Sequence, residues 1–207
     1  MTHIFWDFNG TILDDARLCH DILVDMLAEE GQPTVSYDEY LMIFDFPVEA
    51  YYAKVYDFSK TSFDVLAQRF IERYQPQSLH LKLHDHVLTV IDHFARQGIQ
   101  NVLLSASEQN NLLEQLEHYG IGHHFAHVLG TSNVHAASKI DVARQFITNQ
   151  KIDPSAIILV GDTLHDAEVA EALGCRVVLY TKGHQHPDRL TAYDNIDDFR
   201  QLIDIMK

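Results

Sequence analysis

The sequence predicts an α/β fold: a parallel β-sheet with helices wound on both faces and a helical insertion. From residue 84 onward, short apolar runs alternate with segments of helical periodicity, which is the pattern of successive β-α-β units. One run, 157–160, is apolar at every position, as expected of a central parallel strand buried on both faces. Residues 14–81 instead show helical periodicity and few β-branched runs. We therefore expect a doubly wound sheet that is interrupted by helices after its first strand.

The composition narrows the class of protein. The chain has 207 residues, 46% of them hydrophobic, which is enough for one domain or for a core with a smaller insertion. Fifteen basic residues against 30 acidic ones give a net charge of −15, so we expect no nucleic acid partner. Two cysteines form no disulfide framework, and no apolar run approaches membrane-spanning length. We expect a cytoplasmic protein without a membrane partner, either a monomer or a homodimer.

The insertion contains four predicted helices. Apolar residues recur at helix spacing over 18–27, and Gly31 with Pro33 ends that helix. Shorter helices are expected over 37–43, 48–56 and 63–74. The insertion is rich in aromatic side chains, which we expect to form its own core rather than a ligand site. They are Phe44, Phe46, Tyr51, Tyr52, Tyr56 and Phe58.

The remaining elements follow from periodicity and from glycine stops. Val87, Val90, Ile91 and Phe94 share one face of a helix that Gly98 closes. Strands are expected over 101–104, 127–129, 157–160 and 176–180. Further helices are expected over 112–119, from Ser138, over 167–173 and over 199–206.

The first predicted strand ends in a carboxylate. Asp7 follows the apolar residues 4–6, and Gly10 then allows the backbone to turn sharply. Open α/β sheets place ligands at the carboxyl ends of their strands, and a carboxylate buried there needs a partner. Asp7 alone is weak evidence, because aspartate before a turn is common.

Three later stretches also follow apolar runs, and they complete a pattern. Ser105 and Ser107 come after 102–104, Ser138 precedes Lys139, and a stretch with Asp162 and Asp166 comes after 157–160. Lys139 stands at a predicted helix start, where a cation opposes the helix dipole, which suggests a local anion. Carboxylates such as Asp162 and Asp166 are oxygen ligands of the kind that Mg²⁺ prefers. In this order, from Asp7 to Asp166, the stretches resemble the four motifs of the haloacid dehalogenase superfamily of phosphohydrolases.

The resemblance implies a Rossmann-like core from residues 1–13 and 83–207, with a helical cap over residues 14–82, as in phosphoglycolate phosphatase-like members. The implied reaction is Mg²⁺-dependent hydrolysis of a small phosphorylated metabolite through an aspartyl-phosphate on Asp7. Ser105 and Lys139 would hold phosphoryl oxygens, joined by the backbone around Gly10, Thr11 and Ala106. The Mg²⁺ ligands would be Asp7, the backbone carbonyl of Asn9 and Asp162, with Asp166 supporting them.

Asn9 departs from the family pattern. The family has a second aspartate at this position, which protonates the leaving group and activates water. An amide cannot titrate, so Asn9 can do neither. The sequence allows three explanations. Either another group takes over the proton transfers, or the substrate has a good leaving group, or the protein binds phosphate without rapid turnover. A catalytically weakened phosphate-binding protein is therefore one alternative function.

Two further features of the sequence bear on function. Phosphonatases of the superfamily also lack the second aspartate and use a cap lysine, so C–P bond hydrolysis through Lys54 or Lys60 is a second alternative. The chain has 14 histidines, with close pairs at 84/86, 123/124 and 184/186. None has the partners of a zinc site, and we expect these histidines in solvent-exposed loops, with no role for His165.

Overall fold

The structure, a computed structural model, describes residues 1–131 and 139–206. Among these residues, six parallel strands form one sheet in the order β3-β2-β1-β4-β5-β6. The strands are β1 (His3–Trp6), β2 (Gln100–Glu108), β3 (His127–Thr131), β4 (Ile157–Gly161), β5 (Arg176–Tyr180) and β6 (Asn195–Ile196). This arrangement confirms the predicted α/β fold with a parallel sheet.

Helices cover both faces of the sheet, because alternate strand residues point to opposite sides. Ile4 and Trp6 of β1 pack on one face with α5 (Val87–Arg96), α6 (Gln109–Tyr119) and α9 (Gln201–Ile205). Phe5 packs on the other face with α7 (Lys139–Gln150) and α8 (Leu164–Leu173). The central strand β4 is buried at every position, as its uninterrupted apolar run predicted.

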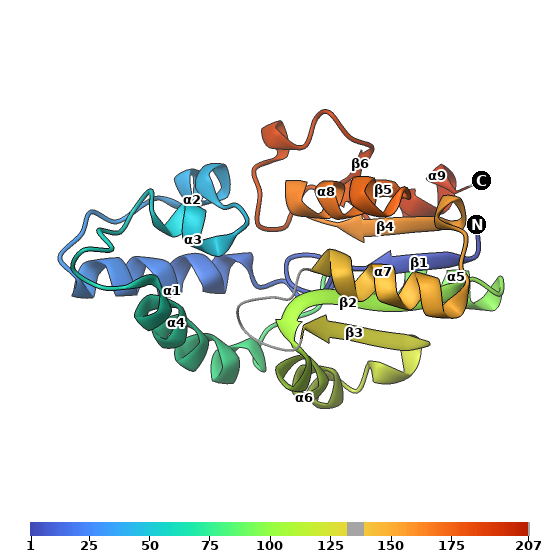
Figure 1. Cartoon of the computed structure of the whole chain (residues 1–207), viewed down its shortest axis with the longest axis horizontal. Helices are drawn as coiled ribbons and strands as arrows, with labels where there is room; N and C mark the ends of the chain where they lie inside the picture. The colour runs from blue at the N-terminus through green and yellow to red at the C-terminus, as the bar shows by residue number, and fades with distance from the viewer. Residues whose placement is uncertain (132–138, 207) are drawn as a thin grey trace.

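The helices between β1 and β2 have a hydrophobic core of their own. They are α1 (Ala16–Glu29), α2 (Tyr37–Ile43), α3 (Val48–Tyr52) and α4 (Phe63–Ser78), and we call them the helical unit. Leu23, Tyr40 and Leu66 are completely buried within it. Figure 1 shows the helical unit at the end of the molecule toward which the arrows of β1, β3 and β4 point. No helix in the described ranges combines the length and apolarity needed to cross a membrane.

Several predicted boundaries differ from the structure. The third helix of the unit stops at Tyr52 instead of residue 56, and α4 continues to Ser78 instead of residue 74. Pro76 lies in the last turn of α4, where it cannot donate the hydrogen bond that a backbone N–H would make to the carbonyl four residues earlier. Strand β2 extends to Glu108, past the predicted end at 104. The two-residue edge strand β6 was not predicted, and the helix start expected at Ser138 lies outside the described residues.

The loop after β5 reaches across to the helical unit. The amide of His186 donates to the Leu41 carbonyl at 3.0 Å, and the Gln185 side chain donates to the Phe44 carbonyl at 2.9 Å. Arg189 forms an ion pair with Asp45 at 2.9 Å. These contacts hold the helical unit over the carboxyl ends of the strands, where the carboxylates predicted from the sequence are located.

Candidate active site

The sheet changes its winding direction between two neighbouring strands, β1 and β4. Chain connections run outward from β1 through β2 to β3 on one side, and from β4 through β5 to β6 on the other. Such a switch point opens a crevice at the carboxyl ends of the strands. Asp7 directly follows β1 and Asp162 directly follows β4, and the Asp7 amide still donates to the Val160 carbonyl at 2.8 Å. The backbone therefore brings both carboxylates to one crevice.

Lys139 joins the carboxylates of Asp7 and Asp166. Its Nζ donates to Asp7 Oδ1 at 2.5 Å and to Asp166 Oδ1 at 2.6 Å, and the lysine side chain is 3% exposed. Asp7, Asp162 and Asp166 also place carboxylate oxygens within 4.8 Å of one another. The residues predicted from the first, third and fourth sequence stretches thus lie together.

Burial and mutual repulsion govern the charge of this cluster. Burial raises the pKa of Asp7 to about 8; the Lys139 ammonium opposes this shift, and the carboxylates of Asp166 and Asp162 add to it. Burial also raises the pKa of Asp162 to about 6. Burial alone would lower the pKa of Lys139, but its two carboxylate partners outweigh burial and raise it. The neighbouring carboxylate oxygens of Asp7, Asp162 and Asp166 make a donor set that fits a divalent cation with a preference for oxygen ligands.

Asp166 also organises the loop that precedes α8. Its Oδ2 accepts hydrogen bonds from the amides of Asp162 and Thr163 and from the Thr163 hydroxyl, at 3.2, 3.1 and 2.8 Å. A side chain at Gly161 would bring its Cβ within 2.2 Å of Asp166 Cγ, so glycine is required there. Asp166 therefore positions both Lys139 and the loop that carries Asp162.

Gly10 forms the expected turn, and Gly10 and Thr11 also contact Asp162, which the sequence did not indicate. Gly10 has φ +74°, and a Cβ there would lie 2.3 Å from Asp162 Oδ2. The Gly10 amide donates to Asp15 Oδ1 at 2.7 Å, and the Thr11 amide donates to the Phe8 carbonyl. The Thr11 hydroxyl donates to Asp162 Oδ1 at 2.9 Å. These donors of Gly10 and Thr11 are therefore engaged within the protein.

The amide of Asn9 is held in one orientation. Its Nδ2 donates to Asp15 Oδ2 at 2.8 Å and to the Tyr74 hydroxyl oxygen at 2.5 Å. Its Oδ1 accepts from the Ser107 hydroxyl at 2.8 Å. Both ends of the amide are therefore satisfied, and Asn9 links the strand ends to helix α4.

Ser105 is buried, and Ala106 follows it along the edge of the cavity described below. Ser105 Oγ accepts from the Ser107 amide at 3.1 Å. Neither serine caps helix α6, because Glu108 takes that position and its carboxylate accepts from the amides of Asn110 and Asn111.

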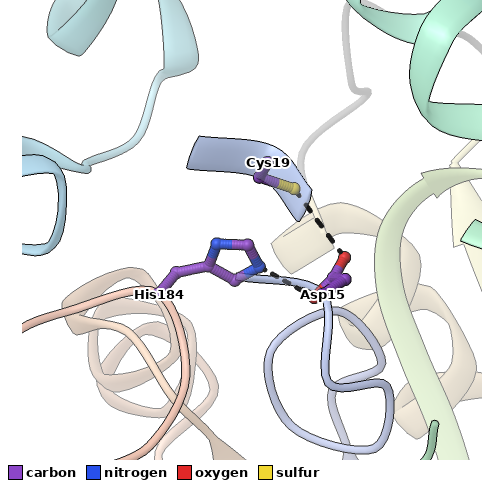
Figure 2. A group of neighbouring side chains, drawn as sticks. All are labelled: Asp15, Cys19 and His184. Atoms are coloured by element: carbon purple, nitrogen blue, oxygen red, sulfur yellow. Dashed lines mark hydrogen bonds and ion pairs between the residues drawn. The ribbon is translucent and has the colours of Figure 1, made fainter. Parts of the chain in front are cut away.

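His184 corrects the expectation that the paired histidines lie in exposed loops. It is 3% exposed, and Figure 2 shows its ring directed toward Asp15, with the thiol of Cys19 from α1 near the same carboxylate. His184 Nε2 lies 3.0 Å from Asp15 Oδ1, and Nδ1 lies 2.8 Å from the Tyr40 hydroxyl. Burial disfavours the imidazolium, but the Asp15 carboxylate outweighs burial and raises the pKa of His184 to about 9.

Asp15, Cys19 and His184 belong to one buried hydrogen-bond network. Asp15 accepts from Asn9, Gly10 and Tyr74 in addition to pairing with His184. Both ring nitrogens of His184 have partners. Burial raises the pKa of the Cys19 thiol well above its ordinary value, which keeps the thiol protonated. Through Asp15 and Tyr74, this network fixes the orientation of the Asn9 side chain.

His184→Gln is expected to lower the free energy of unfolding by about 3 kcal/mol, because it leaves the buried Asp15 carboxylate without a cation. Since the pKa of His184 rises from 6.5 to about 9 on folding, its stabilisation is complete below pH 6.5 and is lost as the pH rises through 9. Urea unfolding at several pH values measures both effects. His186→Gln is the control because His186 is partly exposed, and an equal loss in both variants would contradict the prediction.

A cavity of about 250 Å³ lies between the strand ends and the helical unit. Its base is formed by the polar group described above: Asp7, Asn9, Ser105, Lys139, Asp162 and Asp166. Phe44, Tyr51 and Tyr52 face it while also belonging to the core of the helical unit, so they serve both purposes. His165 stacks on Phe46 with ring centroids 4.7 Å apart at the cavity wall. Lys54 and Lys60 are exposed and do not line the cavity.

The strand order and the buried carboxylate cluster define an α/β protein with an acidic ligand site at the switch point of its sheet. The chain belongs to the haloacid dehalogenase-like hydrolase family, whose model matches residues 4–180. It is accordingly a phosphohydrolase of that family. This confirms the resemblance that the sequence motifs indicated.

Named relatives and solved structures agree with this assignment. N-acetylmuramic acid 6-phosphate phosphatase of Pseudomonas putida is 24% identical over 190 residues, which are 89% of this chain and 85% of that protein. Phosphoglycolate phosphatase of Pseudomonas syringae pv. tomato is 24% identical over 212 residues, 97% of this chain and 78% of that protein. A haloacid dehalogenase-like hydrolase from Streptococcus pneumoniae shares the fold, with a TM-score of 0.85 at 19% identity over 100% of this chain and 99% of that one.

Proposed function

We propose that the chain is a Mg²⁺-dependent phosphatase that hydrolyses a small phosphate monoester through an aspartyl-phosphate on Asp7. The observation that carries this proposal is the placement of Asp7 at the base of the cavity, paired with Lys139 and close to Asp162 and Asp166. A carboxylate nucleophile needs a cation to reduce repulsion from an incoming phosphate dianion. Lys139 is positioned to provide that charge.

Each polar group at the base of the cavity has a role in this proposal. An Asp7 oxygen attacks phosphorus, the Lys139 ammonium binds a phosphoryl oxygen, and the Ser105 hydroxyl with the Ala106 amide binds another. Asp166 positions Lys139 and the loop of Asp162. Asp7, Asp162 and the backbone carbonyl of Asn9 would hold Mg²⁺, which would neutralise charge on the phosphoryl group when bound. We propose that residues 14–82 act as the cap and that the core comprises 1–13 and 83–207.

The substrates named for the relatives are small phosphorylated metabolites, and the size of the cavity suits a substrate of this kind. Asn9 keeps a second function open, because its amide is locked between Asp15, Tyr74 and Ser107 and cannot transfer protons. A weakened protein of this type would be stabilised by phosphate in a melting experiment without releasing phosphate from esters. The phosphonatase alternative is not favoured, because neither cap lysine reaches the cavity.

Asp162→Asn is expected to raise the Mg²⁺ concentration needed for half-maximal phosphate release by at least about tenfold, because it removes one anionic ligand. The measurement is phosphate release from a panel of small phosphate esters at increasing Mg²⁺, after treatment with EDTA. Asp14→Asn is a matched control, since Asp14 is exposed and lies outside the cavity lining. Activity that survives EDTA, or an unchanged Mg²⁺ requirement in Asp162→Asn, would argue against the proposed metal site.

A further inference from the structure

The wall of the cavity opposite Asp7 is apolar and aromatic. The helical unit contributes to it Phe44, Phe46, Val48, Tyr51, Tyr52, Ala67, Phe70 and Ile71. A dry cavity of about 150 Å³ is known to hold benzene. At about 250 Å³, this cavity has room for one aromatic ring together with a phosphoryl group. The part of a substrate that leaves would therefore contact rings and aliphatic side chains.

The same wall offers no spare cation. Among the described residues that line the cavity, Lys139 is the only lysine or arginine, and it is paired with Asp7 and Asp166. The two histidines of the lining also have acidic partners: His184 is paired with Asp15, and His165 Nδ1 lies 3.3 Å from Glu168 Oε2. Residues 132–138, outside the described part, contain no lysine or arginine. A carboxylate on the leaving group would be buried there without a partner, which is costly.

The basic residues of the helical unit are all engaged elsewhere. Arg69 pairs with Glu30 and Arg73 with Glu29, at 2.5 and 2.7 Å. The contacts of the other three are Arg17 over the Tyr37 ring, Lys54 with the Ile43 carbonyl, and Lys60 with Asp57. None of the five lines the cavity. A phosphorylated carboxylic acid therefore finds no unpaired lysine or arginine among the described residues that line the cavity.

The chemistry at Asn9 restricts the leaving group in a second, independent way. The locked Asn9 amide cannot protonate a departing oxygen, because a carboxamide does not titrate and both of its ends are already hydrogen-bonded. An alkoxide has a conjugate acid with a pKa near that of water, about 15.7. A phenol resembles tyrosine, with a pKa of about 10, and its oxygen leaves with far less help.

From these two observations we propose that the substrate is the phosphate monoester of a neutral, phenol-type aromatic alcohol. This inference rests on the proposed phosphatase function. Asp7 forms the new bond to phosphorus as the bond to the aryl oxygen breaks, and the electron pair leaves with that oxygen as a phenoxide. The phenoxide takes a proton from water after release. Hydrolysis of the aspartyl-phosphate then consumes one water molecule and returns Asp7.

The proposal has two parts, a phenol-type leaving group and the absence of a negative charge on it. Comparing phenyl phosphate with benzyl phosphate tests the first part, and comparing it with 4-carboxyphenyl phosphate tests the second. The aliphatic acid ester 2-phosphoglycolate is the fourth substrate. With Mg²⁺, kcat/KM for phenyl phosphate should exceed that for benzyl phosphate by at least about 10²-fold. It should exceed that for 4-carboxyphenyl phosphate by at least about tenfold, although the carboxylated phenol leaves as readily. Asn9→Asp should raise the rate with benzyl phosphate by about 10- to 100-fold and change that with phenyl phosphate much less.

A pair of arginine variants on α4 tests the neutral wall. Ile71 lines the cavity, whereas Val65 on the same helix is 45% exposed and does not. Ile71→Arg should lower kcat/KM for phenyl phosphate by about tenfold and raise it for 4-carboxyphenyl phosphate, because it supplies the missing cation. Val65→Arg should change neither value. Identical behaviour of the two variants would overturn the assignment of this wall.

The outcomes also separate this inference from the function on which it rests. Faster release from 2-phosphoglycolate or benzyl phosphate than from phenyl phosphate, with the activity lost in Asp7→Asn, would overturn the aromatic substrate and leave the phosphatase standing. Absence of phosphate release from all four esters, in this chain and in Asn9→Asp, would overturn both.

Discussion

Asp7→Asn is expected to reduce Mg²⁺-dependent phosphate release by at least about 10⁴-fold, because an amide cannot replace the carboxylate oxygen that attacks phosphorus. Stability should respond differently. Burial, together with Asp166 and Asp162, raises the pKa of Asp7 to about 8, so the folded protein disfavours the charge that the substitution removes. In metal-free buffer at pH 7, the melting temperature should therefore be equal to or higher than that of the unchanged chain.

The two measurements together distinguish a nucleophile from a structural acid. Phosphate release reports the chemical step, and a melting curve without Mg²⁺ reports the fold. A large loss of stability in Asp7→Asn would show that Asp7 mainly holds Lys139 in place. Activity within about tenfold of the unchanged chain would remove Asp7 from the mechanism. Asp14→Asn, at an exposed position on the same turn, should leave both measurements unchanged.

Sequence reasoning found Asp7, Asp162 and Asp166 because one rule connects them. Each follows an apolar run, and the carboxyl ends of parallel strands meet at one edge of the sheet. Lys139 was found because a cation at a helix start is unfavourable without an anion nearby. The structure shows that these anions are Asp7 and Asp166. Local patterns were sufficient here because each residue stands next to a regular element.

The network behind Asn9 was missed because its partners are far apart in the chain. Asp15 and His184 are 169 positions apart, and no periodicity links them. One signal was available: His184 follows strand β5 closely, as Asp7 follows β1, so the same rule could have included it. Asp15 occupies the N-cap position of α1 but makes no capping bond. Its carboxylate oxygens instead contact Gly10, Asn9, Tyr74 and His184. These partners come together only through tertiary packing, so local sequence could not indicate them.

The aromatic residues of the insertion show why substrate preference was not predictable from spacing. Helical periodicity identifies a buried face, but it does not say whether that face packs on protein or borders a cavity. Tyr51 and Tyr52 do both, since they belong to the core of the helical unit and also line the cavity. Tertiary contacts of the helical unit, such as those with the loop after β5 and with α6, place them opposite Asp7.

Lys139→Met is expected to remove most activity and to destabilise the protein, because it leaves the buried carboxylates of Asp7 and Asp166 without their ammonium. Removing one member of a buried ion pair typically costs about 3–5 kcal/mol, which corresponds to a decrease of about 10 °C in melting temperature for a chain of this size. Phosphate release should fall by about 10²- to 10³-fold through the lost contact to the phosphoryl group.

Measuring the stability and the rate of Lys139→Met with added Mg²⁺ separates two roles of the lysine, charge balance and contact with phosphate. If Asp7 and Asp162 hold the metal, Mg²⁺ should recover part of the lost melting temperature in Lys139→Met, because it supplies positive charge to the same carboxylates. It should not recover the rate, because the contact between the ammonium and the phosphoryl oxygen is still missing. Lys82→Met, which removes an exposed lysine outside the cavity, should show neither effect. Recovery of both stability and rate would mean that Lys139 only balances charge, and its proposed contact with phosphate would be wrong.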